Sequence, residues 1–346
     1  MNKLLKKLTE APGISGFENE VRRLIRDLIA EHVDQWRTDA LGNLIALKKG
    51  TGESELNLLL DAHMDEVGLM VTSADSLGAL KFKPVGGVNS AAIVGKMVRV
   101  GSNGLTGVIG AKPVHLLKDE QRRSKNRIDT LRIDIGAKSK EEAARKAKPG
   151  TPAVFISEYE EYGEVAVGKA FDDRAGCAVL ITLLQRNPFP FDLTAVFSVQ
   201  EEVGLRGAGV AAFGVKPDAA IVLESTPAYD LPTERDESPN VVLGRGPAIY
   251  VMDRGTIQDP RLVSFLMKTA DANGIPFQIR RPGGGGTNTA VIQRSGPGIP
   301  AATVSVPARY IHGPVSMINL DDFEKTIDLV ETALRSFDEE LIKPKG

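Results

Sequence analysis

The chain has 346 residues, of which 42% are apolar and 25% charged, and its formal net charge is −2. This composition is typical of a globular protein of one or two domains, and it excludes a basic surface for nucleic acid or anionic lipid. The sequence contains no apolar run of 18 residues, its basic start lacks the apolar stretch of a signal peptide, and its one cysteine, Cys177, fits a reducing compartment. We therefore expect a cytoplasmic protein that binds neither nucleic acid nor membranes.

The first 68 residues predict two helices followed by two strands. The helices are expected at 2–10 and 18–32, the second because apolar residues recur at helical spacing from Val21. The strands are expected at 43–49 and 55–63. The run at 55–63 is almost continuously apolar, which is typical of a strand that is covered on both faces.

Residues 69–166 have a different texture. Short strand-like runs alternate with Gly, Asn and Asp, which predicts a small β-barrel or sandwich. One helix is expected after Ser139, because Glu142 completes a capping box with it. A charged, exposed loop is expected at 115–129.

From residue 167 onwards, strands and helices alternate, which favours a largely parallel sheet with helices on both faces. The predicted helices are 172–186, 205–214, 260–274 and 320–337, and the predicted strands are 194–200, 219–225 and 301–307. We therefore predict an α/β domain made of residues 1–68 plus 167–346, with residues 69–166 inserted into it.

Polar residues follow several of the predicted strands at the end where ligands gather in open α/β sheets. Only two of the four histidines, His63 and His312, occur at such positions, whereas His32 and His115 do not. The carboxylates in this context are Asp65, Glu201, Glu202, Glu224 and the pair Asp172 and Asp173.

Two imidazoles and this many carboxylates are too rich a ligand set for one zinc ion, which takes about four ligands. Two ions could share a carboxylate. One ion would bind His63, an aspartate of the pair and Glu224; the other would bind the same aspartate, Glu202 and His312. Asp65 could accept the second N–H of His63, as is common around metal-bound histidines, and Glu201 is left over.

Each feature also has an ordinary explanation. Two aspartates before a helix are often only a helix cap, and two glutamates after a strand are usually a solvated turn. The coincidence of these features at neighbouring strand ends favours the metal site.

Five motifs then resemble one family. HMDEVG at 63–68, AFDDRAG at 170–176, EEVG at 201–204, VLEST at 222–226 and YIHGP at 310–314 occur in the order and approximate spacing of the TET-type di-metal aminopeptidases. That family includes glutamyl and deblocking aminopeptidases and "cellulase M"-like proteins. The resemblance covers essentially the whole chain.

The resemblance implies a phosphorylase/hydrolase-like three-layer α/β catalytic domain with an inserted small PDZ-like β-barrel used in dimerisation. It also implies peptide substrates cleaved at the N-terminus, two Zn²⁺ or Co²⁺ ions per subunit, and homo-oligomers in which dimers assemble into a tetrahedral dodecamer. By similarity the metal ligands are His63, Asp172, Glu202, Glu224 and His312. Glu201 resembles the general base acting on a metal-bridging water, Asp65 resembles the carboxylate that orients His63, and the bond between Asp172 and Asp173 is expected to be cis.

The sequence departs from the family pattern at three places. Glu224 and Asn288 stand where aspartate is common, and GPVS at 313–316 replaces a Ser-Pro-x-Glu pattern. A glutamate at 224 is also compatible with a deacylase or carboxypeptidase, which leaves the exact reaction open.

Other interpretations of the chain fit the sequence less well. A glycoside hydrolase would need an aromatic groove and has no use for the two histidines, and aromatic residues make up only 5% of the chain. A structural shell protein that has lost its metals is opposed by the intact ligand set. The Gly-rich loop at 282–290 lacks the Gly-Lys-Ser/Thr of a phosphate-binding loop. Arg206 and Arg254 could select an acidic side chain, although a surface or interface charge is the simpler explanation for each.

Overall fold

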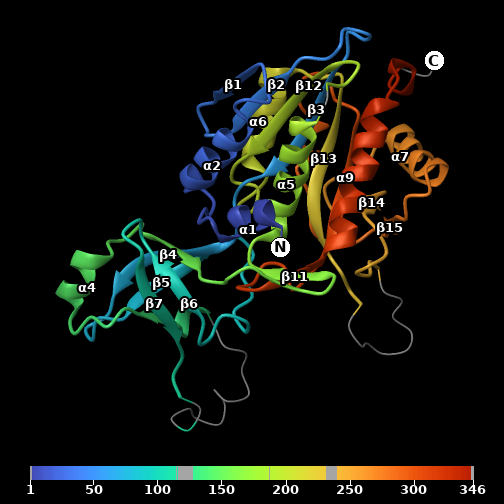
Figure 1. Cartoon of the computed structure of the whole chain (residues 1–346). Coiled ribbons are helices and arrows are strands. Elements are labelled where there is room, and N and C mark those ends of the chain that lie inside the picture. Colours follow the sequence, from blue (N-terminus) through green and yellow to red (C-terminus); the bar gives the residue numbers. More distant parts are fainter. Residues whose placement is uncertain (1, 114, 116–127, 187, 231–239, 344–346) are drawn as a thin grey trace.

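The structure is a computed structural model that describes residues 2–113, 115, 128–186, 188–230 and 240–343. Figure 1 shows a large α/β body and a smaller β-rich body that extends from it. The first and the last described residues both belong to the α/β body.

Among the described residues, the α/β body is built on an 11-stranded sheet. Its four central strands are parallel, whereas the strands on either side of them pair with their neighbours antiparallel. The prediction of a largely parallel sheet is therefore right for the centre and wrong for the flanks, because the short loops at the two edges of the sheet can connect only antiparallel neighbours. The order is β1 (Gln35–Thr38), β2 (Leu44–Lys48), β12 (Asp192–Ser198), β3 (Asn57–His63), β13 (Ala219–Pro227), β16 (Ala301–Arg309), β17 (Ser316–Asn319), β11 (Val165–Gly168) and β10 (Glu160–Tyr162), with β14 (Ala248–Tyr250) joining β16 to β15 (Gln278–Arg280).

Helices cover both faces of this sheet. Successive residues of a strand face opposite sides, so Leu58 and Leu60 of β3 enter one core, whereas Leu59 enters the other. The larger core receives residues from α1 (Lys3–Glu10), α2 (Asn19–Ile29), α5 (Phe171–Gln185), α7 (Pro260–Ala272) and α9 (Leu320–Arg335), and the smaller from α6 (Arg206–Val215) and α8 (Thr289–Ile292). In Figure 1, α5 and α9 lie in front of the central strands. The result is the three-layer arrangement that the sequence predicted.

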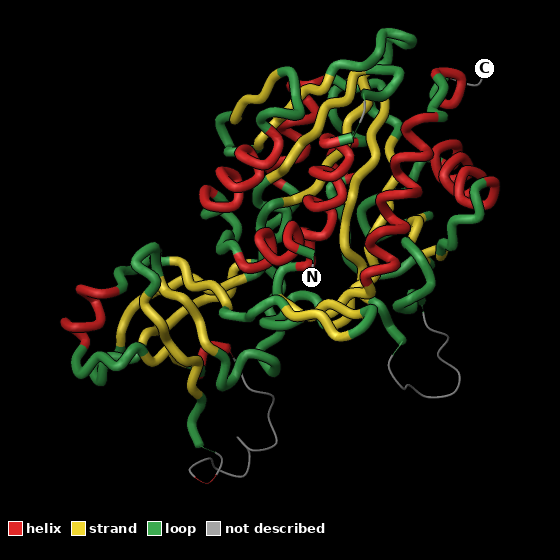
Figure 2. Tube along the Cα trace, viewed as in Figure 1, coloured by secondary structure: helices red, strands yellow, loops and turns green. Residues whose placement is uncertain are grey.

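Six of the described strands close a small barrel around a separate apolar core. Figure 2 shows it set apart from the large sheet, with α4 (Lys140–Lys146) at its far side. The Ser139 hydroxyl caps α4 by accepting from the amide of Glu142, as predicted, but the Glu142 carboxylate accepts from the amide of Lys138 and not from that of Ser139. The strand order is β4 (Gly68–Ala74), β5 (Leu80–Val85), β8 (Arg132–Asp134), β7 (Leu105–Gly110), β6 (Met97–Val100) and β9 (Pro152–Phe155).

The barrel strands end at Phe155, whereas β10, which falls within the predicted insert at 69–166, and β11, which begins there, belong to the large sheet. The sequence did not reveal these two strands because each is only three or four residues long. Residues 116–127 of the predicted charged loop lie outside the described residues. Within the described part of the chain, no helix is both long and apolar enough to cross a membrane.

Candidate metal centre

The predicted site residues come together at one edge of the large sheet. Because the central strands are parallel, their carboxyl ends meet there. β3 ends at His63, β13 carries Glu224, and His312 follows β16. Asp172 and Asp173 open α5, and Glu201 and Glu202 follow β12. The remaining histidines, His32 and His115, are exposed and do not line this site.

Asp172 lies between the two imidazoles. Its Oδ1 is 3.3 Å from His63 Nε2, and its Oδ2 is 3.3 Å from His312 Nε2. The peptide bond to Asp173 is cis, in line with the resemblance. Each oxygen of Asp172 therefore faces a different histidine, which is the arrangement that a shared metal ligand requires.

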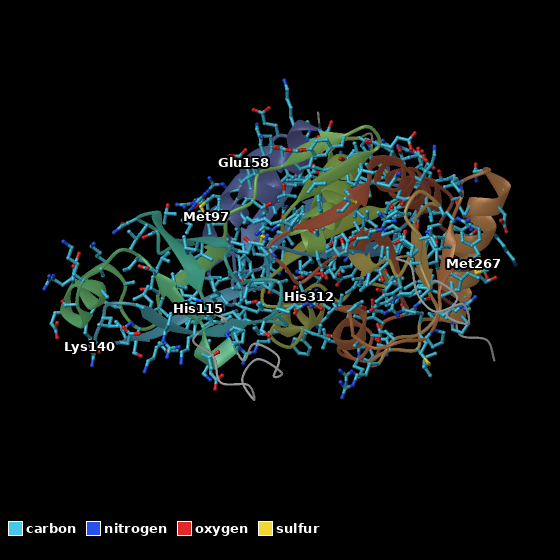
Figure 3. All side chains as sticks on the ribbon, turned by 90° about the horizontal axis from the view of Figure 1, so that it is seen from below. Met97, His115, Lys140, Glu158, Met267 and His312 are labelled. Carbon is cyan, nitrogen blue, oxygen red and sulfur yellow. The ribbon has the colours of Figure 1, made fainter. Side chains whose placement is uncertain are left out.

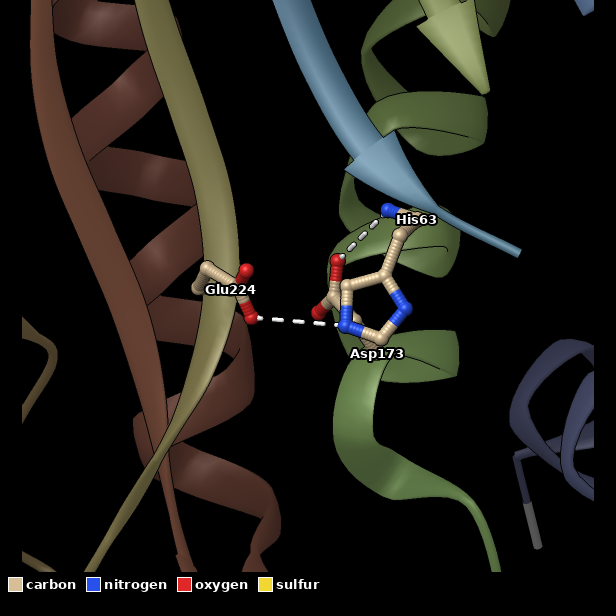
Figure 4. Close-up of side chains that lie close together, drawn as sticks. All are labelled: His63, Asp173 and Glu224. Carbon is tan, nitrogen blue, oxygen red and sulfur yellow. Dashed lines mark hydrogen bonds and ion pairs between the residues drawn. The ribbon is translucent and has the colours of Figure 1, made fainter. Parts of the chain in front are cut away.

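Glu224 and Asp173 approach His63 from two other sides (Figure 4). Glu224 Oε2 is 3.7 Å from His63 Nε2. Asp173 Oδ2 accepts the backbone N–H of His63 at 3.2 Å, and its Oδ1 accepts the amide of Gly176 at 3.0 Å. His63, Asp173 and Glu224 could hold a metal ion as a group, but both oxygens of Asp173 already serve backbone amides.

The two adjacent glutamates take different positions. Glu202 Oε2 is 3.5 Å from His312 Nε2, and Glu202 forms a second possible metal-binding group with His63 and Asp172. Glu201 Oε2 lies 3.9 Å from His63 Nε2. Neighbours on a strand face apart, but Gln200 has a φ of 57°, so the chain has left strand geometry before Glu201. Both carboxylates can therefore face the same cleft.

Asp65 joins the first histidine to the glutamate pair. Its buried carboxylate accepts the amides of Glu201 and Glu202 at 3.0 and 3.1 Å, and it also accepts the Ser15 hydroxyl at 2.5 Å. The nearest acceptor for His63 Nδ1 is the Asp65 carbonyl oxygen at 3.0 Å, while the carboxylate lies at 3.5 Å. Asp65 thus contacts the outer side of His63 and also fixes the loop that follows β12.

The site carries a large excess of buried negative charge. Burial raises the pKa of Glu202 to about 8, and burial together with the neighbouring carboxylates raises the pKa of Glu201 well above its ordinary value. Burial acts the same way on Asp172, but the adjacent imidazoles of His312 and His63 hold its pKa below the usual range. Asp172 Oδ1 is buried without a hydrogen-bond donor. Because buried carboxylates need counter-charge, this oxygen-rich and imidazole-containing set fits divalent cations.

A cleft of about 650 Å³ opens beside these residues, and the Gly284–Gly286 stretch of the Gly-rich loop forms part of its wall. Arg280 and Tyr250 also line it. Sequence reasoning missed both residues because the short strands β14 and β15 that carry them gave no recognisable pattern. The sequence instead offered Arg206 and Arg254 as side chains that could select an acidic substrate residue, but both are exposed and neither lines the cleft.

The structure explains the departure at Asn288. Its Nδ2 donates to Asp61 Oδ2 at 2.8 Å and lies 2.9 Å from the Ser198 hydroxyl, and all three residues are buried behind the cleft. Burial raises the pKa of Asp61 to about 7. An aspartate at 288 would place a second buried carboxyl beside Asp61, whereas the amide supplies a donor.

Solved aminopeptidase structures share this fold over nearly the whole chain, which places the protein among the peptide hydrolases of the aminopeptidase class. The solved structure of a TET aminopeptidase from Thaumarchaeota archaeon SCGC AB-539-E09 has a TM-score of 0.94 to this chain at 36% identity, with 98% of this chain and 97% of the other covered. The dodecameric PhTET1-12s structure has a TM-score of 0.85 at 35% identity, with 97% and 100% covered.

A family model described as M42 glutamyl aminopeptidase matches residues 42–329, and the chain belongs to this family. A candidate aminopeptidase of Acetivibrio thermocellus is 38% identical over 96% of this chain and 97% of its own. The lysyl aminopeptidase of Pyrococcus furiosus is 33% identical over 96% of each chain, and the glutamyl aminopeptidase of Lactococcus lactis is 32% identical over 98% of this chain and 97% of its own. The predicted fold class and the predicted aminopeptidase activity are thereby confirmed.

The contact between Asn288 and Asp61 yields a stability prediction. Asn288→Asp should lower the free energy of unfolding by about 1–3 kcal/mol, because a buried donor is replaced by a second carboxyl. Urea denaturation at neutral pH measures this. The exchange Asn273→Asp, at the less buried C-cap of α7, is the control and should cost less. Equal stability of Asn288→Asp and the parent chain would contradict this account of Asn288.

Proposed function

We propose that the cleft is a two-metal aminopeptidase centre that binds two divalent ions, Zn²⁺ or Co²⁺. One ion would be held by His63, Asp172 and Glu224, and the other by Asp172, Glu202 and His312. The observation that carries this proposal is the position of Asp172, whose two oxygens face the two imidazoles at 3.3 Å each.

The choice of Asp172 over Asp173 as the shared ligand has separate support. Asp173 already accepts two backbone amides, and it lies on the His63 side of the site. Asp172 faces both histidines. We therefore assign the role of shared ligand to Asp172. Asp173 instead holds the backbone of His63 by accepting its amide N–H.

When bound, such ions would polarise the scissile carbonyl and make water a better nucleophile. Glu201 would take a proton from the attacking water and pass it to the leaving amine. Its raised pKa, caused mainly by burial, favours a group that can hold that proton. The Asp65 carboxylate would keep Glu201 in place by accepting the backbone N–H of Glu201.

The role of Glu201 can be tested by Glu201→Gln. The amide cannot accept the proton, so turnover should fall roughly 10²–10⁴-fold, while both metals stay bound, because Glu201 is not among the proposed ligands. Steady-state kinetics and elemental analysis measure the two quantities. Near-normal turnover, or loss of a metal, would assign Glu201 a different role.

The ligand scheme can be tested by His312→Ala. It should remove about one of the two metals per subunit, because the second position loses its only imidazole. His32→Ala, which changes an exposed histidine away from the cleft, should keep both. Elemental analysis after dialysis decides between them, and a full metal complement in His312→Ala would refute the scheme.

Arg280 supports a preference for an acidic N-terminal residue. It is 5% exposed, and its guanidinium stacks over the Tyr250 ring at 4.4 Å from the centroid. The acceptors of its hydrogen bonds are neutral oxygens: Thr226 Oγ1 and the Gly284 carbonyl at 3.0 Å, and the Arg281 carbonyl at 3.5 Å. Among the described residues, no carboxylate pairs with it. A buried cation in a substrate cleft without a counter-ion suits a substrate carboxylate.

The place of Arg280 in the site agrees with this preference. Thr226 lies two residues after Glu224 on β13, so both side chains face the same side of the strand. The guanidinium is therefore held on the side of the sheet that carries the proposed metal ligand. The relatives include a lysyl and a glutamyl aminopeptidase, so membership of the family does not by itself fix the preferred N-terminal residue of the substrate.

Kinetics on aminoacyl p-nitroanilides test this preference. The parent chain should cleave the Glu substrate with a higher kcat/KM than the Leu or Lys substrate. Arg280→Gln should reduce the Glu-to-Leu ratio about tenfold to a hundredfold, which corresponds to one charge-assisted hydrogen bond. Arg281→Gln, at the exposed neighbouring arginine, is the matched control. An unchanged ratio in Arg280→Gln, or faster cleavage of N-acyl amino acids than of any anilide, would contradict the proposal.

We further propose that the insert at 69–166 serves dimerisation and that dimers assemble further. Related solved structures support the assembly, one being a dodecamer and another being described as a tetrahedron or a large octahedral shell. A cytoplasmic location stays a prediction that rests on composition and on the single cysteine.

A further inference from the structure

The inserted barrel reaches the candidate metal centre through Gly86–Asn89, the segment that follows β5. Gly86 has a φ of +79°, and a Cβ there would lie 3.2 Å from Glu202 Cβ and 2.8 Å from Val67 Cγ1. The barrel therefore packs directly against one proposed metal ligand, at a distance that leaves no room for a side chain.

The next residues of this segment contact a second ligand. A Cβ on Gly87 would lie 3.0 Å from His312 Nδ1, and the amide of Asn89 donates to the His312 carbonyl at 3.3 Å. Figure 3 shows His312 where the barrel meets the α/β body. His312 itself has a φ of 61°, so its backbone conformation is unusual for a residue with a side chain.

The two histidines are held in different ways. His63 is 1% exposed, and the Asp65 carbonyl lies 3.0 Å from its Nδ1. The His312 side chain is 40% exposed, and within the described residues no hydrogen bond is made by its Nδ1. A metal-bound histidine usually has such a bond, which fixes the orientation of the ring. At His312 the backbone of Gly87 instead leaves so little room beside Nδ1 that a Cβ would lie 3.0 Å from it.

We propose that Gly86–Asn89 is a positioning segment through which the barrel sets the affinity of the metal position that uses His312 and Glu202. This inference rests on the two-metal centre proposed above. The atoms nearest to a Cβ on Gly86 or Gly87 belong to Val67, Glu202 and His312, and none of them belongs to His63 or Glu224. A side chain at 87 would move His312 by a few tenths of an ångström and weaken one metal position selectively.

The test uses Gly87→Ala and Gly87→Val with Gly110→Ala as the matched control, since Gly110 is a barrel glycine without a positive φ, and a Cβ there meets only Arg132 O at 4.0 Å. Metal-free protein is titrated with Co²⁺ and followed by calorimetry and visible absorption. We expect the weaker step to lose several-fold affinity in Gly87→Ala and at least tenfold in Gly87→Val. The tighter step should stay unchanged, and Gly110→Ala should match the parent chain.

Unchanged metal affinities in both Gly87 variants, or equal weakening of both binding steps, would overturn the inference. If Gly87→Val does not fold, the affinities of Gly87→Ala alone provide the test. A parent chain that binds fewer than two ions would instead refute the two-metal centre. Thermal unfolding of the metal-free variants provides the fold control.

Discussion

The structure depends on holding several carboxylates together in a buried cleft. Five carboxylates converge there. Asp172, Glu201, Glu202 and Glu224 lie within ion-pair distance of the two histidines, and Asp173 accepts the backbone amide of His63. Asp172 raises the pKa of His312 to about 9, which favours the protonated form of this imidazole. Divalent ions would replace protons at the imidazoles and satisfy the same carboxylates.

The surrounding scaffold meets this constraint with fixed donors. Asp65 holds the glutamate loop through two amides. The residue after Asp65 is the buried Glu66, and each of its carboxylate oxygens accepts a hydrogen bond from Lys169 Nζ at 2.7 Å. It also lies 3.6 Å from Arg174 and accepts the amide of Gly13. This buried ion cluster ties the His63 loop, the start of α5 and the N-terminal segment together, and removing Glu66 would leave two buried cations without their carboxylate.

The barrel is part of the same construction. It begins at Gly68, directly after the loop that follows His63, and it returns at Gly86 and Gly87 against Glu202 and His312. The inserted domain therefore also lies against the candidate metal centre. Arg280 and Tyr250 line the cleft from the additional strands β14 and β15. The two proposals thus place substrate preference and metal affinity in different parts of the chain.

The sequence by itself determined the class of fold, the parallel centre of the sheet and the residues at its carboxyl edge. Runs such as 55–63 and 219–225 are apolar on both faces, and polar residues follow them at fixed places, so local pattern was sufficient. Motif order then identified the aminopeptidase family.

Only the tertiary structure decided the rest. The antiparallel flanks and the short strands β10, β11, β14 and β15 depend on pairing between distant segments, which local periodicity does not encode. The separate places of Glu201 and Glu202 follow from the backbone at Gln200, the need for an amide at 288 follows from Asp61, and the isolation of Arg280 follows from its burial. Each of these depends on which side chains meet across the fold, and a single sequence does not specify that.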